Sequence, residues 1–186
     1  MTRTEIPFNI LVLFVVVTLA AILQDGLPPL PWGGVKAPFL IGVAAYYALR
    51  RPWPLALPAI VWSGLLLDGL SSLPGGGTGL AAMLALAAFC AAWGRKQLPE
   101  NILSCLVVGS VTTGLLTLIE YVVLRLRGDL PALAVSFVLL RVVISFIYAV
   151  PVCAAVAAVA GVLDRLALNV RTEKNAAGFD WSSNSV

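Results

Sequence analysis

The chain has 186 residues, of which 60% are hydrophobic and 11% are charged, and its mean hydropathy is +0.98. A soluble globular domain has roughly 45–50% apolar and about 25% charged residues. This composition excludes a water-soluble domain, a disordered chain and a secreted disulfide scaffold, and it indicates a small integral membrane protein. The net charge of +3 comes from basic residues in short loops between apolar runs, which fits membrane orientation better than nucleic-acid binding.

The apolar runs predict six helices. The first run, Ile6–Leu23, follows a short basic start and lacks a good cleavage site, so we expect an uncleaved first helix. Residues 24–36 are rich in glycine and proline and predict a loop. The second run is short for a span, and the last contains Arg141 and Pro151 but no turn signal, which predicts one long helix kinked at the proline. The five later runs are Ala37–Leu49, Leu55–Leu67, Leu80–Trp93, Ile102–Leu124 and Ala132–Leu163.

The distribution of basic residues predicts that both termini are cytoplasmic. With the N-terminus inside, three basic residues lie outside, Lys36, Arg125 and Arg127, and eight lie inside. The inner set is Arg3, Arg50, Arg51, Arg95, Lys96, Arg165, Arg171 and Lys174. We therefore expect a transmembrane helical bundle over residues 1–168 and a polar, disordered cytoplasmic tail over residues 169–186.

Several kinds of chemistry are excluded by composition. The chain has no histidine, which excludes Ser-His-Asp and Cys-His catalysis and histidine-ligated zinc or haem. Its cysteines, Cys90, Cys105 and Cys153, lie in apolar runs without CxxC spacing, so we expect buried, inert thiols. The glycines of the 75–79 loop lack the lysine of a phosphate-binding loop. We expect no catalytic residue, no metal site, no cofactor and no enzyme activity.

The most specific stretch runs from Gly64 to Leu70 and on through Pro74 to Gly79. An aspartate at a membrane helix end, Asp68, is costly unless it reaches water or a partner. The glycines allow two helices and a tight connection to approach closely. Two interpretations stay open: a functional polar feature at the outer mouth of the bundle, or an interfacial aspartate that ends a helix before a flexible loop.

Two further ionisable residues, Glu120 and Arg141, lie inside apolar runs at similar expected depths. Charged residues within a membrane are functional candidates by default. Asp68 is a second possible partner for Arg141, so we expect a polar cluster of Asp68, Glu120 and Arg141. The cluster is either functional or a structural ion pair that locks the fifth and sixth helices.

Small residues recur four positions apart, which allows helices to pack closely. This spacing serves either internal packing of one bundle or a face that docks a partner. The pairs are Ala44 and Ala48, Ala81 and Ala85, Gly109 and Thr113, Ser110 and Gly114, Ala154 and Ala158, and Ala157 and Gly161.

Three stretches share a pattern with a known family: Pro38-Phe39-Leu40, Tyr46-Tyr47-Ala48-Leu49 and Gly64-Leu65-Leu66-Leu67-Asp68. By these stretches, and by chain length and helix number, about a third of the chain resembles the family of the rod shape-determining membrane protein MreD. The motif-like residues are Gly64, Leu65, Asp68, Pro74 and Gly79. The loop from Pro74 to Gly79 holds more glycines than the usual turn of the family.

This resemblance implies a non-enzymatic inner-membrane scaffold of the bacterial cell-elongation machinery, which directs rod shape and peptidoglycan synthesis. The implied partners are an MreC-like bitopic membrane protein, MreB filaments, peptidoglycan synthases and membrane lipid, with no nucleic acid. The implied fold is similar to the substrate-binding subunits of energy-coupling-factor vitamin transporters, so the alternative function is that of such a subunit.

Two features of the sequence favour the scaffold over the transporter subunit. The first helix is mostly bulky and has no pair of small residues four apart, whereas many vitamin-binding subunits dock through such a face. A site for a soluble substrate also needs several convergent polar groups. Asp68, Glu120 and Arg141 are the ionisable candidates in the apolar runs or at their ends, and we expect them to satisfy one another.

Overall fold

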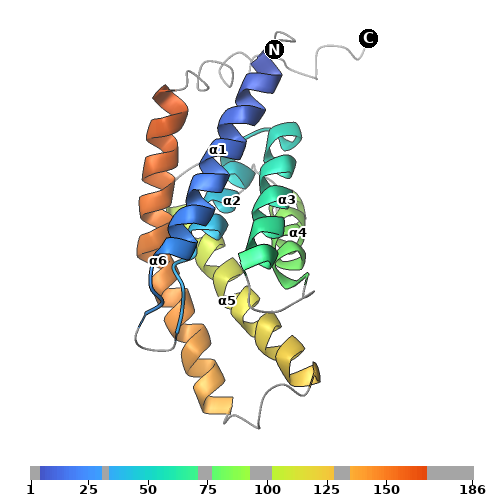
Figure 1. Ribbon diagram of the computed structural model, residues 1–186, viewed down its shortest axis with the longest axis vertical. Coiled ribbons are helices and arrows are strands. Elements are labelled where there is room, and N and C mark those ends of the chain that lie inside the picture. Colours follow the sequence, from blue (N-terminus) through green and yellow to red (C-terminus); the bar gives the residue numbers. More distant parts are fainter. Residues whose placement is uncertain (1–4, 31–33, 71–76, 93–101, 128–134, 167–186) are drawn as a thin grey trace.

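The computed structural model describes residues 5–30, 34–70, 77–92, 102–127 and 135–166, and these residues form six helices and no strand (Figure 1). The predicted all-helical bundle is thereby confirmed. The predicted tail, residues 169–186, lies outside the described residues. The helices are α1 (Glu5–Gly26), α2 (Phe39–Arg50), α3 (Trp53–Leu70), α4 (Thr78–Ala92), α5 (Ile102–Arg127) and α6 (Val135–Leu166).

Helix boundaries follow the apolar runs with one functionally relevant difference. Helix α6 is continuous for 32 residues through Pro151, as predicted. Helix α1 continues past Leu23 to Gly26, so Gln24 and Asp25 belong to its last turn and not to a loop. Neither residue breaks a helix. The helix ends at Gly26, and Pro28 follows two residues later.

Three helices in the described ranges are long and apolar enough to cross a membrane: α3, α5 and residues 136–163 of α6. Helices α2 and α4 have 12 and 15 residues. At 1.5 Å per residue they reach about 18 and 22 Å, less than the roughly 30 Å of a hydrocarbon core. The six apolar runs thus give six helices but not six full-length spans.

Large apolar side chains cover the outside of the bundle. Helix α6 exposes residues such as Leu139, Ile147 and Val159, each more than half exposed, and α1 and α5 do the same along their outer faces. Soluble proteins rarely expose continuous apolar surface of this extent, whereas lipid chains solvate it without cost. Together with the three long helices, this surface makes the chain a helical membrane protein.

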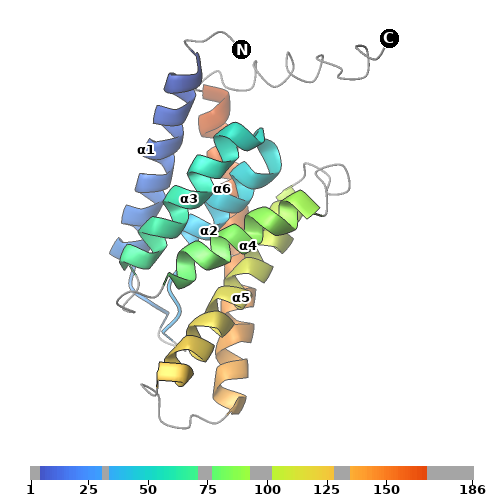
Figure 2. The same cartoon turned by 90° about the vertical axis from the view of Figure 1, so that its right-hand side faces the viewer.

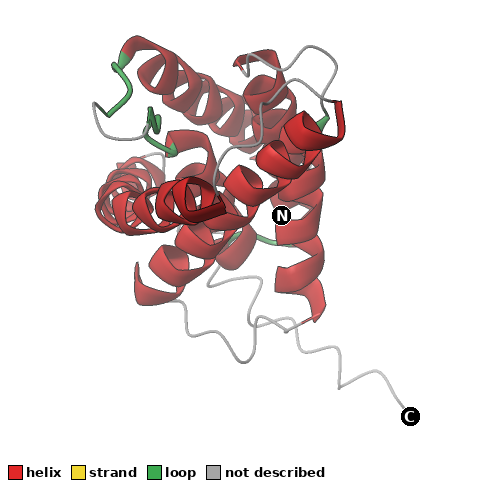
Figure 3. Cartoon of the chain, turned by 90° about the horizontal axis from the view of Figure 1, so that it is seen from below, coloured by secondary structure: helices red, strands yellow, loops and turns green. Residues whose placement is uncertain are grey.

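The short helix α2 is the centre of the bundle. Its residues Leu40–Leu49 are all buried, and it contacts each of the other five helices. The outer helices pack in the order α1, α3, α4, α5, α6, and α1 and α6 share little contact. Figure 2 shows α4 inclined away from α1, and Figure 3 shows the crossing helices from below.

Small residues allow the outer helices to approach α2 and one another. A Cβ atom added at Gly42 of α2 would lie 3.2 Å from the Cβ of Val156 in α6. A Cβ atom added at Gly109 of α5 would lie 2.6 Å from the Sγ of Cys153 in α6. The pairs Ala44 and Ala48, Gly109 and Thr113, and Ser110 and Gly114 face inward, so they serve internal packing.

Candidate functional site

Helices α3 and α4 meet at two glycines of the motif-like stretch. A Cβ atom at Gly64 would lie 2.9 Å from the Cα atom of Leu80, and one at Gly79 would lie 2.9 Å from the Cβ of Leu67. Real Cβ atoms do not approach that closely, so close helix packing requires glycine at both positions. Leu65 points outward with 48% of its surface exposed, and Pro74 lies outside the described residues.

Asp68 caps the start of α4 from the neighbouring helix. The carbonyl oxygen of Gly77 accepts the first hydrogen bond of α4, from the N–H of Ala81 at 3.0 Å, so Gly77 is the N-cap residue. Glycine has no side chain to cap with. The N–H of Gly79 donates to Oδ1 of Asp68 at 2.7 Å, and that of Leu80 donates to Oδ2 at 3.0 Å. Asp68 thus accepts hydrogen bonds from the two backbone N–H groups that the side chain of an N-cap residue usually binds.

Gln24 plays the same part at the start of α2. The carbonyl oxygen of Pro38 accepts from the N–H of Gly42 at 3.0 Å, which makes Pro38 the N-cap residue, and its side chain cannot accept a hydrogen bond. The buried Oε1 of Gln24 accepts from the N–H of Leu40 at 3.1 Å. Gln24 and Asp68 each lie two positions before the last residue of their helix, so the same capping arrangement joins α1 to α2 and α3 to α4.

Sequence reasoning singled out Asp68 but missed Gln24. The available signal was a polar residue at the end of one helix, followed by a short helix whose own N-cap residue has no accepting side chain. For Asp68, the required partner is the N-terminus of α4, because two backbone N–H groups satisfy the carboxylate. Asp68 therefore joins α3 to α4, and it is not in hydrogen-bonding contact with Glu120 or Arg141.

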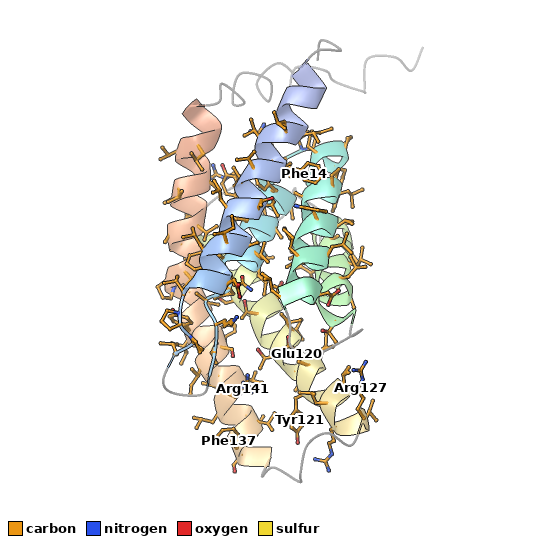
Figure 4. All side chains as sticks on the ribbon, viewed as in Figure 1. Phe14, Glu120, Tyr121, Arg127, Phe137 and Arg141 are labelled. Carbon is orange, nitrogen blue, oxygen red and sulfur yellow. The ribbon has the colours of Figure 1, made fainter. Side chains whose placement is uncertain are left out.

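Glu120 and Arg141 face one cavity but form no ion pair with each other, so the polar cluster that the sequence predicts is not held together by a direct contact between them. Both residues line a cavity of about 510 Å³, yet no pair of their charged atoms comes within 4.0 Å. Glu120 is half-buried and Arg141 is exposed. Figure 4 shows the two side chains on α5 and α6, in the half of the molecule that extends beyond the other helices.

The separation of the two charges follows from the divergence of α5 and α6. At Gly109 an added Cβ atom would lie 2.6 Å from Cys153, whereas at Gly114 the nearest α6 atom would be 3.8 Å away, in Phe146. The helices separate further toward their connection, as Figure 1 shows. The antiparallel register that places Gly109 beside Cys153 also places Glu120 level with Arg141. The two residues therefore lie at similar depth, and the divergence of α5 and α6 sets the distance between them.

The cavity holds more polar groups than the sequence suggested. Asp25 at the end of α1 pairs with Lys36 of the following segment, at 3.2 Å, and both line the cavity together with Gln24. The expectation of few convergent polar groups is therefore wrong, because residues assigned to a loop belong to the wall. The other polar lining residues are Thr113, Thr117, Tyr121 and Ser145.

Some of these polar groups already have partners within their own helices. The hydroxyl groups of Thr113, Thr117 and Ser145 donate to backbone carbonyl oxygens four residues earlier. The Tyr121 hydroxyl accepts a hydrogen bond from Arg125 at 3.1 Å. Each hydroxyl oxygen keeps acceptor capacity toward the cavity. Glu120 and Arg141 are the lining charges that have neither a hydrogen bond nor an ion pair within the described part of the chain.

The described side chains include no group of three or more His, Cys, Asp or Glu residues arranged to hold a metal ion. Cys90, Cys105 and Cys153 are buried free thiols.

The fold and these contacts define a class: a helical membrane protein in which two short helices are capped by side chains of the preceding helices, with a polar cavity at one end. No family model, curated protein or solved structure matches the chain. Its functional assignment therefore depends on the geometry described above and on the motif resemblance.

Replacement of Asp68 is expected to destabilise the bundle, and alanine should cost more stability than asparagine. Asp68→Asn keeps one accepting oxygen, whereas Asp68→Ala leaves two backbone N–H groups without partners and should cost about 1–3 kcal/mol. Thermal unfolding in detergent, followed with a thiol-reactive dye that reports the three buried cysteines, measures the effect. The control Asp25→Asn removes an exposed ion pair and should cost less than about 1 kcal/mol. Equal stability of Asp68→Ala and wild type would contradict the capping role.

Alanine substitution at two glycines of α3 should give opposite results. Gly64→Ala places a Cβ atom against the backbone of α4 and should cost about 1–3 kcal/mol, because the helices must separate. Gly69→Ala meets no atom within 4 Å, and it should leave stability unchanged or raise it by up to about 1 kcal/mol through helix propensity. The same dye-based unfolding experiment compares the two. If both variants melt like wild type, the close α3–α4 contact is not required.

Proposed function

We propose that the chain is a non-enzymatic scaffold of the bacterial cell-elongation machinery, of the MreD kind, which docks an MreC-like bitopic partner in the inner membrane. The residues that carry the family resemblance support this proposal because they form one physical unit: Gly64, Asp68 and Gly79 together fix α3 against α4. The Asp68 carboxylate is engaged in capping, which argues against a catalytic task for it.

The observation that carries the docking role is an exposed face of alanines on α4. Ala81, Ala85, Ala88 and Ala92 recur at intervals of four, three and four residues, and all four are exposed. These intervals place them on one side of the helix, where small side chains let another helix approach closely. A single membrane-spanning helix, as in a bitopic protein, is the partner that such a face fits.

Helix α1 presents a different face. Its outward residues include Leu11, Val15 and Ile22, all bulky, while its two alanines, Ala20 and Ala21, are buried against the bundle. The close-approach face that many vitamin-binding subunits use on this helix is therefore missing here. The cavity near Glu120 is the observation that favours the alternative, a substrate-binding subunit of a vitamin-type transporter.

The positive-inside bias supports an orientation with both termini in the cytoplasm. The ends of α1 and α6 that lead to the termini lie at one end of the bundle, and Glu120 and Arg141 lie in the other half (Figures 1 and 4). In this orientation the cavity lies in the periplasmic half of the bundle. MreB filaments would then be reached from the cytoplasmic end, and peptidoglycan synthases through the lipid-facing helices.

Reporter fusions test this orientation. A reporter that is active only in the periplasm should be silent when fused after Arg95 or after Arg171, and active when inserted after Gly76, because the basic residues retain their segments in the cytoplasm. A periplasmically active C-terminal fusion would overturn the topology.

Co-purification tests the docking role. The tagged full-length chain, extracted in mild detergent from a rod-shaped bacterium that expresses an MreC-like protein, should retain that single-span partner. Ala85→Leu enlarges the centre of the alanine face and should reduce retention by at least about tenfold, which corresponds to about 1.4 kcal/mol. The control Ala158→Leu adds the same volume at an exposed position of α6 and should leave retention unchanged.

Two results would contradict the proposal. Equal retention by wild type and Ala85→Leu would show that the partner does not dock on α4. A vitamin retained at one molecule per chain, without a protein partner, would replace the scaffold by the transporter subunit. Mass spectrometry of the purified material distinguishes these results.

A further inference from the structure

The cavity between α5 and α6 has the features of a ligand site that the docking role does not use. Its volume of about 510 Å³ lies within the roughly 300–1,000 Å³ of small-molecule sites. It is lined by residues from α1, α2, α3, α5, α6 and the segment before α2, and by no described residue of α4, which carries the alanine face. The cavity and the proposed docking surface are therefore separate features.

The charges on the cavity wall are balanced in number but not all paired. Two acidic residues, Asp25 and Glu120, face two basic residues, Lys36 and Arg141. Asp25 and Lys36 neutralise each other at 3.2 Å on one wall. Glu120 and Arg141 stand level with each other on the opposite helices, more than 4.0 Å apart. The cavity thus presents one negative and one positive group with space between them.

A charge within a membrane protein is costly unless it is paired or reaches water. An occupant that carries one positive and one negative group can satisfy Glu120 and Arg141 together. An anion would leave Glu120 without a partner, and a cation would leave Arg141 without one.

We propose that this cavity binds a net-neutral zwitterion, whose primary ammonium group pairs with Glu120 and whose oxyanion pairs with Arg141. The planar guanidinium of Arg141 is suited to two parallel hydrogen bonds with a carboxylate or phosphate. Apolar lining residues such as Leu70, Leu116 and Val138 accommodate a hydrocarbon portion. The headgroup of phosphatidylethanolamine and a free amino acid share this chemistry.

Soluble probes test the charge requirement on the unmodified protein. The full-length chain in detergent, freed of lipid by exchange, is titrated calorimetrically with glycerophosphoethanolamine, which is zwitterionic. Glycerophosphoglycerol, which is an anion, and ethanolamine, which is a cation, serve as comparisons. Binding of the zwitterion at least about tenfold tighter than either comparison is expected, because each comparison loses one charge-assisted hydrogen bond. Equal binding of all three, or no binding of any zwitterion, overturns the proposal.

Glycine and intact phosphatidylethanolamine distinguish the two sources of the ligand. Native mass spectrometry of the chain extracted from phosphatidylethanolamine-rich membranes should show one retained lipid if the headgroup is the ligand. Tighter binding of glycine than of glycerophosphoethanolamine, without a retained lipid, assigns the site to a free amino acid. Both results support a zwitterion site, and neither depends on a protein partner.

Charge-removing variants assign the site to the cavity. Glu120→Gln and Arg141→Gln should each weaken zwitterion binding by about tenfold or more. Arg127→Gln removes a charge from the exposed end of α5, away from Glu120 in Figure 4, and should leave binding unchanged. The dye-based unfolding experiment shows whether each variant is folded. Equal affinities of a folded Glu120→Gln and Arg127→Gln overturn the assignment.

Discussion

The bundle depends on satisfying the backbone N–H groups at the starts of two short helices. A backbone N–H group that is buried without a partner costs about 1–3 kcal/mol, because it gives up its hydrogen bond to water. Helices α2 and α4 both begin at residues, Pro38 and Gly77, whose side chains accept no hydrogen bond. Gln24 and Asp68 meet this requirement from the preceding helices. The capping side chains therefore fix where α2 and α4 begin relative to α1 and α3.

This arrangement also explains why the cavity lies at one end. The central helix α2 is only 12 residues long, whereas α5 and α6 have 26 and 32. The two long helices consequently extend beyond α2, and no other described helix lies between their diverging ends (Figure 1). The ends of α1 and α3, together with the 34–38 segment, also line this space. Gln24 lines the cavity and caps α2, so it connects the wall of the cavity to the core.

Hydrophobic periodicity and breakers were sufficient to predict six helices and the continuity of α6 through Pro151, because each helix is one apolar run. The end of α1 was missed, since Gln24 and Asp25 are polar yet compatible with helix. Asp68 was identified from the sequence because a charged side chain is costly in a membrane. Its partner, the start of α4, was not identified, because the two come together only in the folded chain. Glu120 and Arg141 were placed at matching depths by counting residues. Their lateral separation depends on how closely the glycines of α5 approach α6, and this distance cannot be obtained by counting residues.

The alanine face and the cavity are distinct surfaces that share one structural element, the last turn of α3. Leu67 and Leu70 line the cavity, and Asp68 between them holds the start of α4. A substitution at Asp68 consequently acts on both surfaces, through the position of α4 and through the cavity wall. Substitutions at Ala85 and Glu120 are more selective, since neither residue makes a hydrogen bond or an ion pair to the shared turn in the described structure. Scaffold and ligand-binding roles can therefore be separated with these two positions, and not with the aspartate that the sequence makes most conspicuous.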